Sequence, residues 1–157
     1  MCSRTRSLFT LWVALTLGVP GCFMDGPLGP FPGGPLRGGD LVESPVADWS
    51  FVADVEEIEL QLVSQSRSRT TWILFMGGHA YVPSSIGFPP GKNWNARALE
   101  DGRAILRIQG SRYPVTLTRV EDEDLVAALG AVDLAKYPEG PPGKDGIWYF
   151  RVASRAP

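Results

Sequence analysis

Apolar and polar residues mostly alternate with a period of two from Trp49 onward, and this pattern constrains the fold more than any other. The stretch IELQLVS places Ile58, Leu60 and Leu62 on one side, with polar residues between them. The same period recurs in RAILRIQG (103–110), RYPVTLTRV (112–120) and IWYFRVA (147–153). Successive side chains of a β-strand point to opposite faces, so we expect strands with one buried face each.

Three further stretches complete the expected sheet. WSFVADV (49–55) is expected to form a short first strand. TTWILFM (70–76) is almost continuously apolar, which predicts a central strand covered on both faces. Gly77 and Gly78 follow it, and this dipeptide is favoured in two-residue hairpin turns, so AYVP (80–83) should return beside it.

Helical patterns are few. NWNARALEDG (93–102) predicts two turns that begin at Asn93 and end at Gly102. EDEDLVAALGAVDLAKYP (121–138) begins with four acidic residues, which suit the positive end of a helix dipole, and Pro138 ends it. The sequence therefore predicts a mainly β fold, a six- to seven-stranded antiparallel sheet that curls or closes, with one or two short helices.

The N-terminal residues have the layout of an export signal. Arg4 and Arg6 precede the uncharged apolar run LFTLWVALTLG (8–18), and small residues follow in VPGC. A run of about eleven residues is too short to span a bilayer, which needs roughly twenty. We therefore expect a signal peptide over residues 1–21, which leaves a mature chain of one domain.

The end of this signal, LGVPGC, resembles a bacterial lipoprotein signal, in which Cys22 would be lipidated and become the new N-terminus. Pro20 departs from the residue usual at that place, so plain secretion is the alternative. Phe23, rather than an acidic residue, follows the cysteine, and the resemblance then implies an outer-membrane lipoprotein facing the periplasm. The only other cysteine is Cys2, so the folded part must rest on its core rather than on disulfides.

Residues 22–39 are expected to join the anchor cysteine to the domain. Within them, GPLGPFPGGPLRGG (26–39) contains six glycines and four prolines, a composition typical of an extended spacer. The alternative is an ordered arm that packs on the domain through Leu28, Phe31 and Leu36. The domain itself is expected over residues 40–157.

Charge is distributed unevenly along the chain. Without Arg4 and Arg6, thirteen basic and seventeen acidic side chains remain, a net charge of −4. Residues 40–59 hold seven acids and no base, whereas residues 60–120 hold eight bases and two acids. Such a basic block favours a site for phosphate or carboxylate, and the alternative is a set of exposed arginines that keep strand edges soluble. The negative total and the lack of a recognition motif argue against nucleic acid.

Residues for side-chain catalysis are scarce. His79 is the only histidine, no cluster has metal-ligand spacing, and no serine lies in a Gly-x-Ser-x-Gly elbow. The sequence PPGK occurs at 89–92 and at 141–144, but neither copy has the glycine spacing of a P-loop, so we interpret both as turns. No catalytic side chain and no metal site is predicted; if the chain is an enzyme, the chemistry belongs to a bound cofactor.

The order of several short motifs resembles the split β-barrel flavin- and deazaflavin-binding proteins, most of all the deazaflavin-dependent nitroreductases. These motifs are RSRTTWILF, GHAYVPSSIG, a following tryptophan, and LEDGRAILRIQGSRYPVTLTRVED, and they span roughly residues 58–122. The family's glycine-containing turn before the Arg-Thr strand is replaced here by SQSRS (64–68). The resemblance implies a split β-barrel and an FMN- or deazaflavin-type cofactor.

The resemblance also implies the residues that would contact the cofactor. Cofactor phosphate contacts fall at Arg69, Thr70 and Thr71, and a second loop falls at Ser84, Ser85, Ile86 and Gly87, with Lys92 and Trp94 at the entrance helix. Hydroxyls, glycine-loop N–H groups and cationic side chains are the groups that satisfy phosphate oxygens. If the cofactor interpretation holds, Arg69, Ser84, Ser85 and Lys92 should converge on one cleft.

Two functions therefore follow as hypotheses. The first is an exported, lipid-anchored flavin- or deazaflavin-type oxidoreductase or cofactor binder. The second is a cofactor-free envelope lipoprotein whose barrel binds a protein partner or a second copy of itself; a homodimer is compatible with both. A lipid- or haem-carrying barrel is a third class, with His79 as its only histidine ligand.

Overall fold

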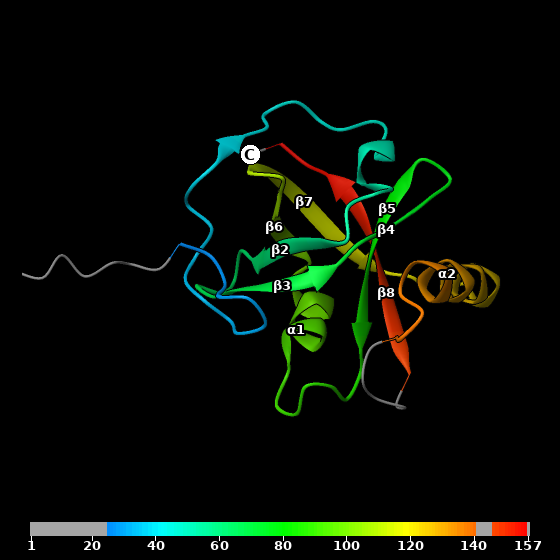
Figure 1. Cartoon of the computed structure of the whole chain (residues 1–157). Coiled ribbons are helices and arrows are strands. Elements are labelled where there is room, and N and C mark those ends of the chain that lie inside the picture. The colour runs from blue at the N-terminus through cyan, green and yellow to red at the C-terminus, as the bar shows by residue number, and fades with distance from the viewer. Residues whose placement is uncertain (1–24, 141–145, 157) are drawn as a thin grey trace, which may run out of the picture.

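The computed structural model describes residues 25–140 and 146–156 and shows a curled antiparallel sheet with two α-helices (Figure 1). The signal peptide and Cys22, predicted from the sequence, lie outside these residues, as does the second PPGK turn. The strands are β1 (Asp40–Leu41), β2 (Glu57–Leu62), β3 (Ser68–Trp72), β4 (Leu74–Met76), β5 (His79–Ser85), β6 (Arg103–Ile108), β7 (Ser111–Arg119) and β8 (Ile147–Ser154). The helices are the 3-10 helix η1 (Ser50–Val52), α1 (Trp94–Glu100) and α2 (Glu123–Lys136).

Seven strands form one continuous sheet in the order β3-β2-β6-β7-β8-β5-β4, and the short β1 pairs in parallel with β7. All the other pairings are antiparallel, and β3 also contacts β5, so the sheet curls into a half-barrel. The prediction of a mainly β, antiparallel fold with short helices is confirmed. No helix among the described residues is long and apolar enough to cross a membrane.

All four alternating stretches form strands, but only β2 and β6 bury every second side chain as their period predicts; β7 and β8 each bury two consecutive residues. In β2, the side chains of Ile58, Leu60 and Leu62 are buried, and in β6 Ala104 and Leu106 are buried in the same way. They meet Phe150 of β8 and Trp94 of α1 in one large apolar core. A second, smaller core lies under α2 and contains Leu74, Tyr81, Leu129 and Tyr149.

The prediction of a strand at residues 49–55 is wrong, because this segment contains the 3-10 helix η1 (Ser50–Val52) and no strand. The side chain of Asp48 accepts hydrogen bonds from the backbone N–H and the hydroxyl of Ser50, at 2.9 and 3.0 Å. This local arrangement starts a tight turn, in which the N–H of Val52 donates to the carbonyl of Trp49. Trp49 and Val52 are both buried, so the period here is three rather than two.

The prediction of one central strand at residues 70–76 is also wrong. The strand is interrupted at Ile73, and the two resulting strands, β3 and β4, lie at opposite edges of the sheet. An apolar run indicates burial but does not show which strands are neighbours. Here burial comes from the curl of the sheet and from α2, which packs against β4.

Residues 25–39 follow the barrel surface as an ordered arm, the second of the two alternatives for this segment. Leu36 is buried, whereas Leu28 and Phe31 are exposed. The arm forms a β-bridge between Gly33 and Ser68 of β3, and a Cβ at Gly33 would lie only 1.8 Å from the carbonyl oxygen of Gly26. Only glycine fits at this close approach of two backbones.

Arg107 fastens the beginning of this arm. Its guanidinium pairs with Asp25 at 2.7 Å and also with Glu59 of β2. Asp25 in turn accepts hydrogen bonds from the backbone N–H groups of Arg37 and Gly38, at 2.7 and 3.1 Å. The two ends of the arm are thus held together on the barrel by one carboxylate and one guanidinium.

Replacing Arg107 by methionine should release the arm. Hydrogen bonds to charged groups each contribute about 1.5–3 kcal/mol, and each 1.4 kcal/mol of lost docking free energy increases the open population about tenfold. We expect trypsin to cleave after Arg37 at least ~10-fold faster in Arg107→Met than in the wild type. The control is Arg103→Met, which removes another arginine of β6 and its exposed ion pair with Asp101. The rate of cleavage after Arg37 should be unchanged in this variant. Equal cleavage of all three proteins would show that Arg107 does not hold the arm.

Candidate functional site

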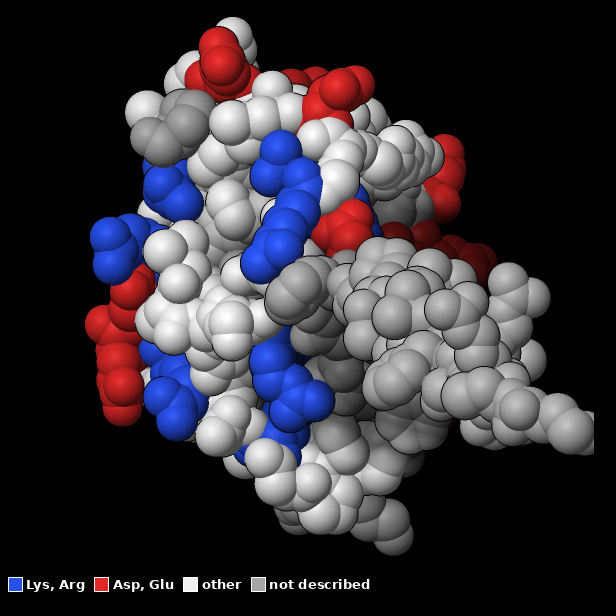
Figure 2. Space-filling view, turned by 90° about the vertical axis from the view of Figure 1, so that its left-hand side faces the viewer, with Lys and Arg blue, Asp and Glu red and all other residues white. Residues whose placement is uncertain are grey.

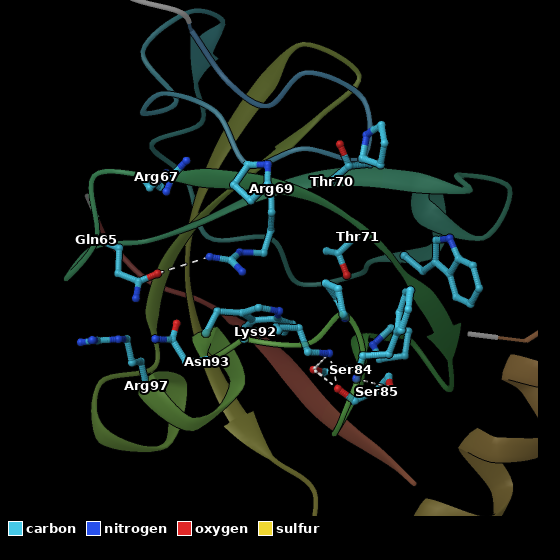
Figure 3. A pocket seen from close by; sticks show the side chains of 18 of the residues that line it. Gln65, Arg67, Arg69, Thr70, Thr71, Ser84, Ser85, Lys92, Asn93 and Arg97 are labelled. Atoms are coloured by element: carbon cyan, nitrogen blue, oxygen red, sulfur yellow. Dashed lines mark hydrogen bonds between the residues drawn. The ribbon is translucent and has the colours of Figure 1, made fainter. Parts of the chain in front are cut away.

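A pocket of about 990 Å³ opens between β3, the end of β5, the loop at 86–93 and the start of α1 (Figure 3). Gly29, Pro30 and Pro32 of the arm form part of its wall. This volume lies at the upper end of the range typical of small-molecule and cofactor sites. Figure 3 shows side chains from β3 and from the loop and helix opposite reaching into the same space.

Seven of the nine predicted cofactor-binding residues line this pocket. They are Arg69, Thr70 and Thr71 of β3, Ser84 and Ser85 of β5, Lys92 of the loop and Trp94 of α1. As expected, one cleft brings together Arg69, Ser84, Ser85 and Lys92. Ile86 and Gly87 do not line the pocket, because the chain turns away there and the N–H of Ile86 donates to the carbonyl of Gly146.

The loop that carries Lys92 is shaped by its PPGK sequence. The N–H of Lys92 donates to the carbonyl of Pro89 at 3.1 Å, and Gly91 has a φ of 80°. These are the features of a type II turn, which requires a positive φ at its third residue. The predicted turn at 89–92 is thus confirmed, and it places the lysine at the start of α1.

Lys92 extends into the pocket toward the end of β5. Its Nζ donates to the Oγ of Ser84 at 3.2 Å and to the backbone carbonyl oxygen of Ser85. Ser84 is almost fully buried, and Lys92 is half-buried. Burial, and then the positive charge of Arg69, lower the pKa of Lys92 to about 8.

Arg69 occupies the centre of the pocket. Its Nη2 donates to the Oε1 of Gln65 at 3.4 Å, and its guanidinium lies 5.7 Å from the centre of the Trp94 ring. The Nε is buried and has no hydrogen-bond partner among the described residues. Burial, followed by the charge of Arg67, lowers the pKa of Arg69 to about 10. A buried donor without a partner is costly, so this N–H suits an acceptor atom of a ligand.

Basic side chains gather on this part of the molecule, and Figure 2 shows several groups of them on one face. Arg67, Arg69, Lys92 and Arg97 all line the pocket, and Glu57 provides the one carboxylate among the described lining residues. None of the four cations forms an ion pair with a carboxylate of the described residues. The pocket is therefore electropositive and suits an anion.

Sequence reasoning missed several lining residues. Arg67 and Arg97 belong to the basic block at residues 60–120, but nothing in that block separates pocket residues from surface residues. Gln65 and Asn93 also line the pocket, and no motif marks them. By composition the arm residues fit either a spacer or an ordered arm, and only the fold reveals that Gly29, Pro30 and Pro32 line the pocket.

Thr70 and Thr71 differ in what they offer the pocket. The hydroxyl of Thr70 donates to the carbonyl of Gly29 at 2.8 Å, so it holds the arm. Figure 3 shows the side chain of Thr71 directed toward the space between β3 and the serines. No group of three metal-ligating side chains is found in the described part of the chain.

The sequence matches no protein-family model, and no curated protein matches it at a significant level.

The lowered pKa of Lys92 predicts a specific pH dependence of stability. Below pH ~8 Lys92 is protonated in both states, whereas between pH ~8 and ~10.4 the folded state releases the proton and the unfolded state keeps it. The unfolded state then binds more protons, so this group makes stability rise with pH in that window. Lys92→Met lacks the effect, and its stability relative to the wild type should fall as the pH is raised from 8 to 10.

Urea unfolding of both proteins at several pH values between 7 and 10 measures this difference. Arg103→Met is the control, since it removes an exposed cation that does not titrate in the window, and its profile should run parallel to the wild type. A parallel profile for Lys92→Met as well would show that Lys92 keeps an ordinary pKa.

Proposed function

We propose that this chain is an exported, lipid-anchored split-barrel protein whose pocket binds the phosphate of a flavin- or deazaflavin-type cofactor, and that it acts as an oxidoreductase. One observation carries the proposal. Hydroxyls and unpaired cations from β3, β5 and the loop before α1 converge on one pocket, in the order in which the resemblance places cofactor contacts.

The donors of the pocket fit the oxygens of a phosphate. Among the described residues, Arg69 offers a buried Nε–H without a partner, and Lys92 offers an ammonium that forms no ion pair with a carboxylate. The hydroxyls of Thr71 and Ser84 lie on the same walls. Phosphate oxygens are strong acceptors, and charge-assisted hydrogen bonds to them are roughly twice as strong as neutral ones.

Aromatic side chains supply the flat part of the site. Trp72 lines the pocket and stacks on Tyr137, with ring centres 4.2 Å apart and an angle of 10° between the planes. This stacking fixes the orientation of the indole, and Phe88 lies on the wall formed by the loop at 86–93. Such surfaces suit a planar ring system.

A bound flavin or deazaflavin would supply the electron-transfer chemistry. The residues of the chain bind and orient: Arg69 and Lys92 hold the anionic group, and the arm residues Gly29–Pro32 limit access of water from one side. No side chain is assigned as an acid, a base or a nucleophile in this reaction.

Ligand-dependent melting of the full-length protein in mild detergent tests the proposal. FMN, riboflavin, a deazaflavin cofactor and haem are compared, and the visible spectrum of the isolated protein is recorded. A ligand at about 100 times its dissociation constant stabilises the folded state by roughly 2.7 kcal/mol. We expect FMN or the deazaflavin to raise the melting temperature, and riboflavin, which lacks the phosphate, to raise it much less.

Variants locate the effect in the pocket. Arg69→Ala and Lys92→Ala should each reduce the shift, because each removes a cation from the anion site. Arg103→Ala should leave it intact, since Arg103 is exposed and paired with Asp101 outside the pocket. The shift should also weaken between pH 7 and pH 9, as Lys92 loses its proton around pH 8.

A colourless protein that no ligand stabilises would contradict the cofactor proposal. The alternative function, a cofactor-free envelope protein that binds a protein partner or a second copy of itself, would then be preferred. A shift equal in wild type and in both pocket variants would place any ligand elsewhere.

The anchor has a separate test. If Cys22 carries lipid, Cys22→Ser should move the protein from the membrane fraction to the soluble envelope fraction after cell breakage, because acyl chains contribute about 0.8 kcal/mol of binding for each buried methylene. Metabolic labelling with a fatty acid should mark the wild type alone. A soluble wild-type protein of unmodified mass would support plain secretion instead.

A further inference from the structure

The lysines of the sequence are Lys92, Lys136 and Lys144, and the two that the structure describes have very different surroundings. The Nζ of Lys136 donates to three backbone carbonyl oxygens, those of Val52, Val55 and Ile73, at 3.4, 2.6 and 2.9 Å. Its donors are used in joining α2 to the barrel. Lys92 instead donates to one hydroxyl and one carbonyl, and its side chain lines the large pocket.

The amine of Lys92 has the setting of a nucleophilic lysine. It is half-buried, it has no carboxylate partner among the described residues, and Arg69 is close enough to act on its charge. Desolvation and a neighbouring cation are the two conditions that keep a lysine neutral and reactive in enzymes that form Schiff bases. With a pKa of about 8, roughly a tenth of the amine is neutral at pH 7, which is some hundreds of times more than for an ordinary lysine.

The groups around Lys92 select the kind of molecule that it meets. In the part of the chain that the structure describes, the charged groups that line the pocket with it are Arg69 from β3, Arg67 from the turn before β3, Arg97 from α1 and Glu57 from β2. Three of these four are cations, and Arg69 carries an unpartnered N–H. A molecule bound beside the amine is therefore expected to carry a carboxylate or a phosphate.

We propose that Lys92 forms an imine with a small aldehyde or ketone whose carboxylate or phosphate is held by the arginines of the pocket. The proposal shares the anion site of the proposed function but does not require a flavin. The lone pair of Nζ attacks the carbonyl carbon and a C–N bond forms, giving a carbinolamine. This loses its hydroxyl and a proton as water, so that amine and carbonyl compound yield imine and water, without oxidant or reductant.

Ser84 is placed to transfer protons in this step. Its Oγ lies 3.2 Å from Nζ and its side chain is almost fully buried, so its position is fixed by the strand. At this distance the hydroxyl can pass a proton between the amine and the departing hydroxyl group. General acid–base assistance of this kind typically contributes 10²- to 10⁴-fold, so its loss should slow imine formation without changing where it occurs.

Two aromatic aldehydes that differ only in a phosphate test the proposal on the unaltered full-length protein. Pyridoxal 5′-phosphate and pyridoxal are added at low concentration, the visible imine band is followed, and the adduct is trapped with borohydride. Peptide mass mapping then gives the occupancy of Lys92, Lys136, Lys144 and the N-terminal amine. We expect pyridoxal 5′-phosphate to label Lys92 at least ~10-fold more than any other amine, and pyridoxal to show no such preference.

Further measurements separate a reactive site from a merely exposed lysine. Inorganic phosphate should suppress labelling of Lys92 by pyridoxal 5′-phosphate at least ~10-fold and leave labelling of the other amines unchanged. The rate should rise with pH to a midpoint near 8, as the amine of Lys92 deprotonates. Ser84→Ala should slow labelling by at least ~10-fold, and Arg69→Gln should abolish the preference for the phosphate.

Equal labelling of all the amines, or equal labelling by the two aldehydes, would overturn the proposal. If Arg69→Gln or Ser84→Ala does not fold, the phosphate competition and the pH midpoint of the wild type still decide it. The melting experiment with FMN has an independent outcome: a melting shift without an imine refutes the imine alone, and an imine without a shift refutes the flavin alone.

Discussion

The architecture depends on how the chain passes from one edge of the sheet to the other at Ile73. This residue belongs to neither β3 nor β4, and it is fully buried, so its backbone groups have no strand partner. The N–H of Ile73 donates to the hydroxyl oxygen of Tyr137 at 3.4 Å. The carbonyl oxygen of Ile73 accepts from the Nζ of Lys136 at 2.9 Å and from the hydroxyl of Tyr137 at 3.1 Å. Buried backbone polar groups require such partners. Two side chains at the end of α2 therefore support the crossing that lets β3 contact β5, and residues of both strands line the pocket.

The partly buried cations of the pocket lower the free energy of unfolding relative to a pocket of neutral side chains. Four cationic side chains share the site with one carboxylate, and burial lowers the pKa of Arg69 and Lys92 because their charged forms are poorly solvated. By contrast Arg107, whose side chain is only 14% exposed, is paired with two acids. Natural sequences depart from local optimisation mostly at functional sites. A cluster of partly buried cations without carboxylate partners among the described residues is consistent with the proposed anion site.

Much of this fold could be predicted from the period, because β2 and β6 each bury every second side chain. The errors have physical causes. At residues 49–55 the side chain of Asp48 starts a tight turn, a local hydrogen bond that hydropathy does not register. At residues 70–76 the apolar run indicates burial but carries no information about neighbours, so strands at opposite edges looked like one central strand. The site could be predicted only where short motifs mark it, so Arg69, Ser84 and Ser85 followed from a resemblance. Arg67 and Arg97 carry no motif, and only the curl of the sheet places them at the pocket.

The position of the clamp between Asp25 and Arg107 has a mechanical consequence. Asp25 precedes Gly29, Pro30 and Pro32 in the chain, and these are the arm residues that line the pocket. A pull on the chain from its N-terminal side would reach the barrel through Arg107 before it reached the pocket wall. If the protein is tethered to a membrane, force on the tether is transmitted to β6 through the ion pair between Asp25 and Arg107. Thermal motion of the tether would then not displace the arm residues that line the pocket.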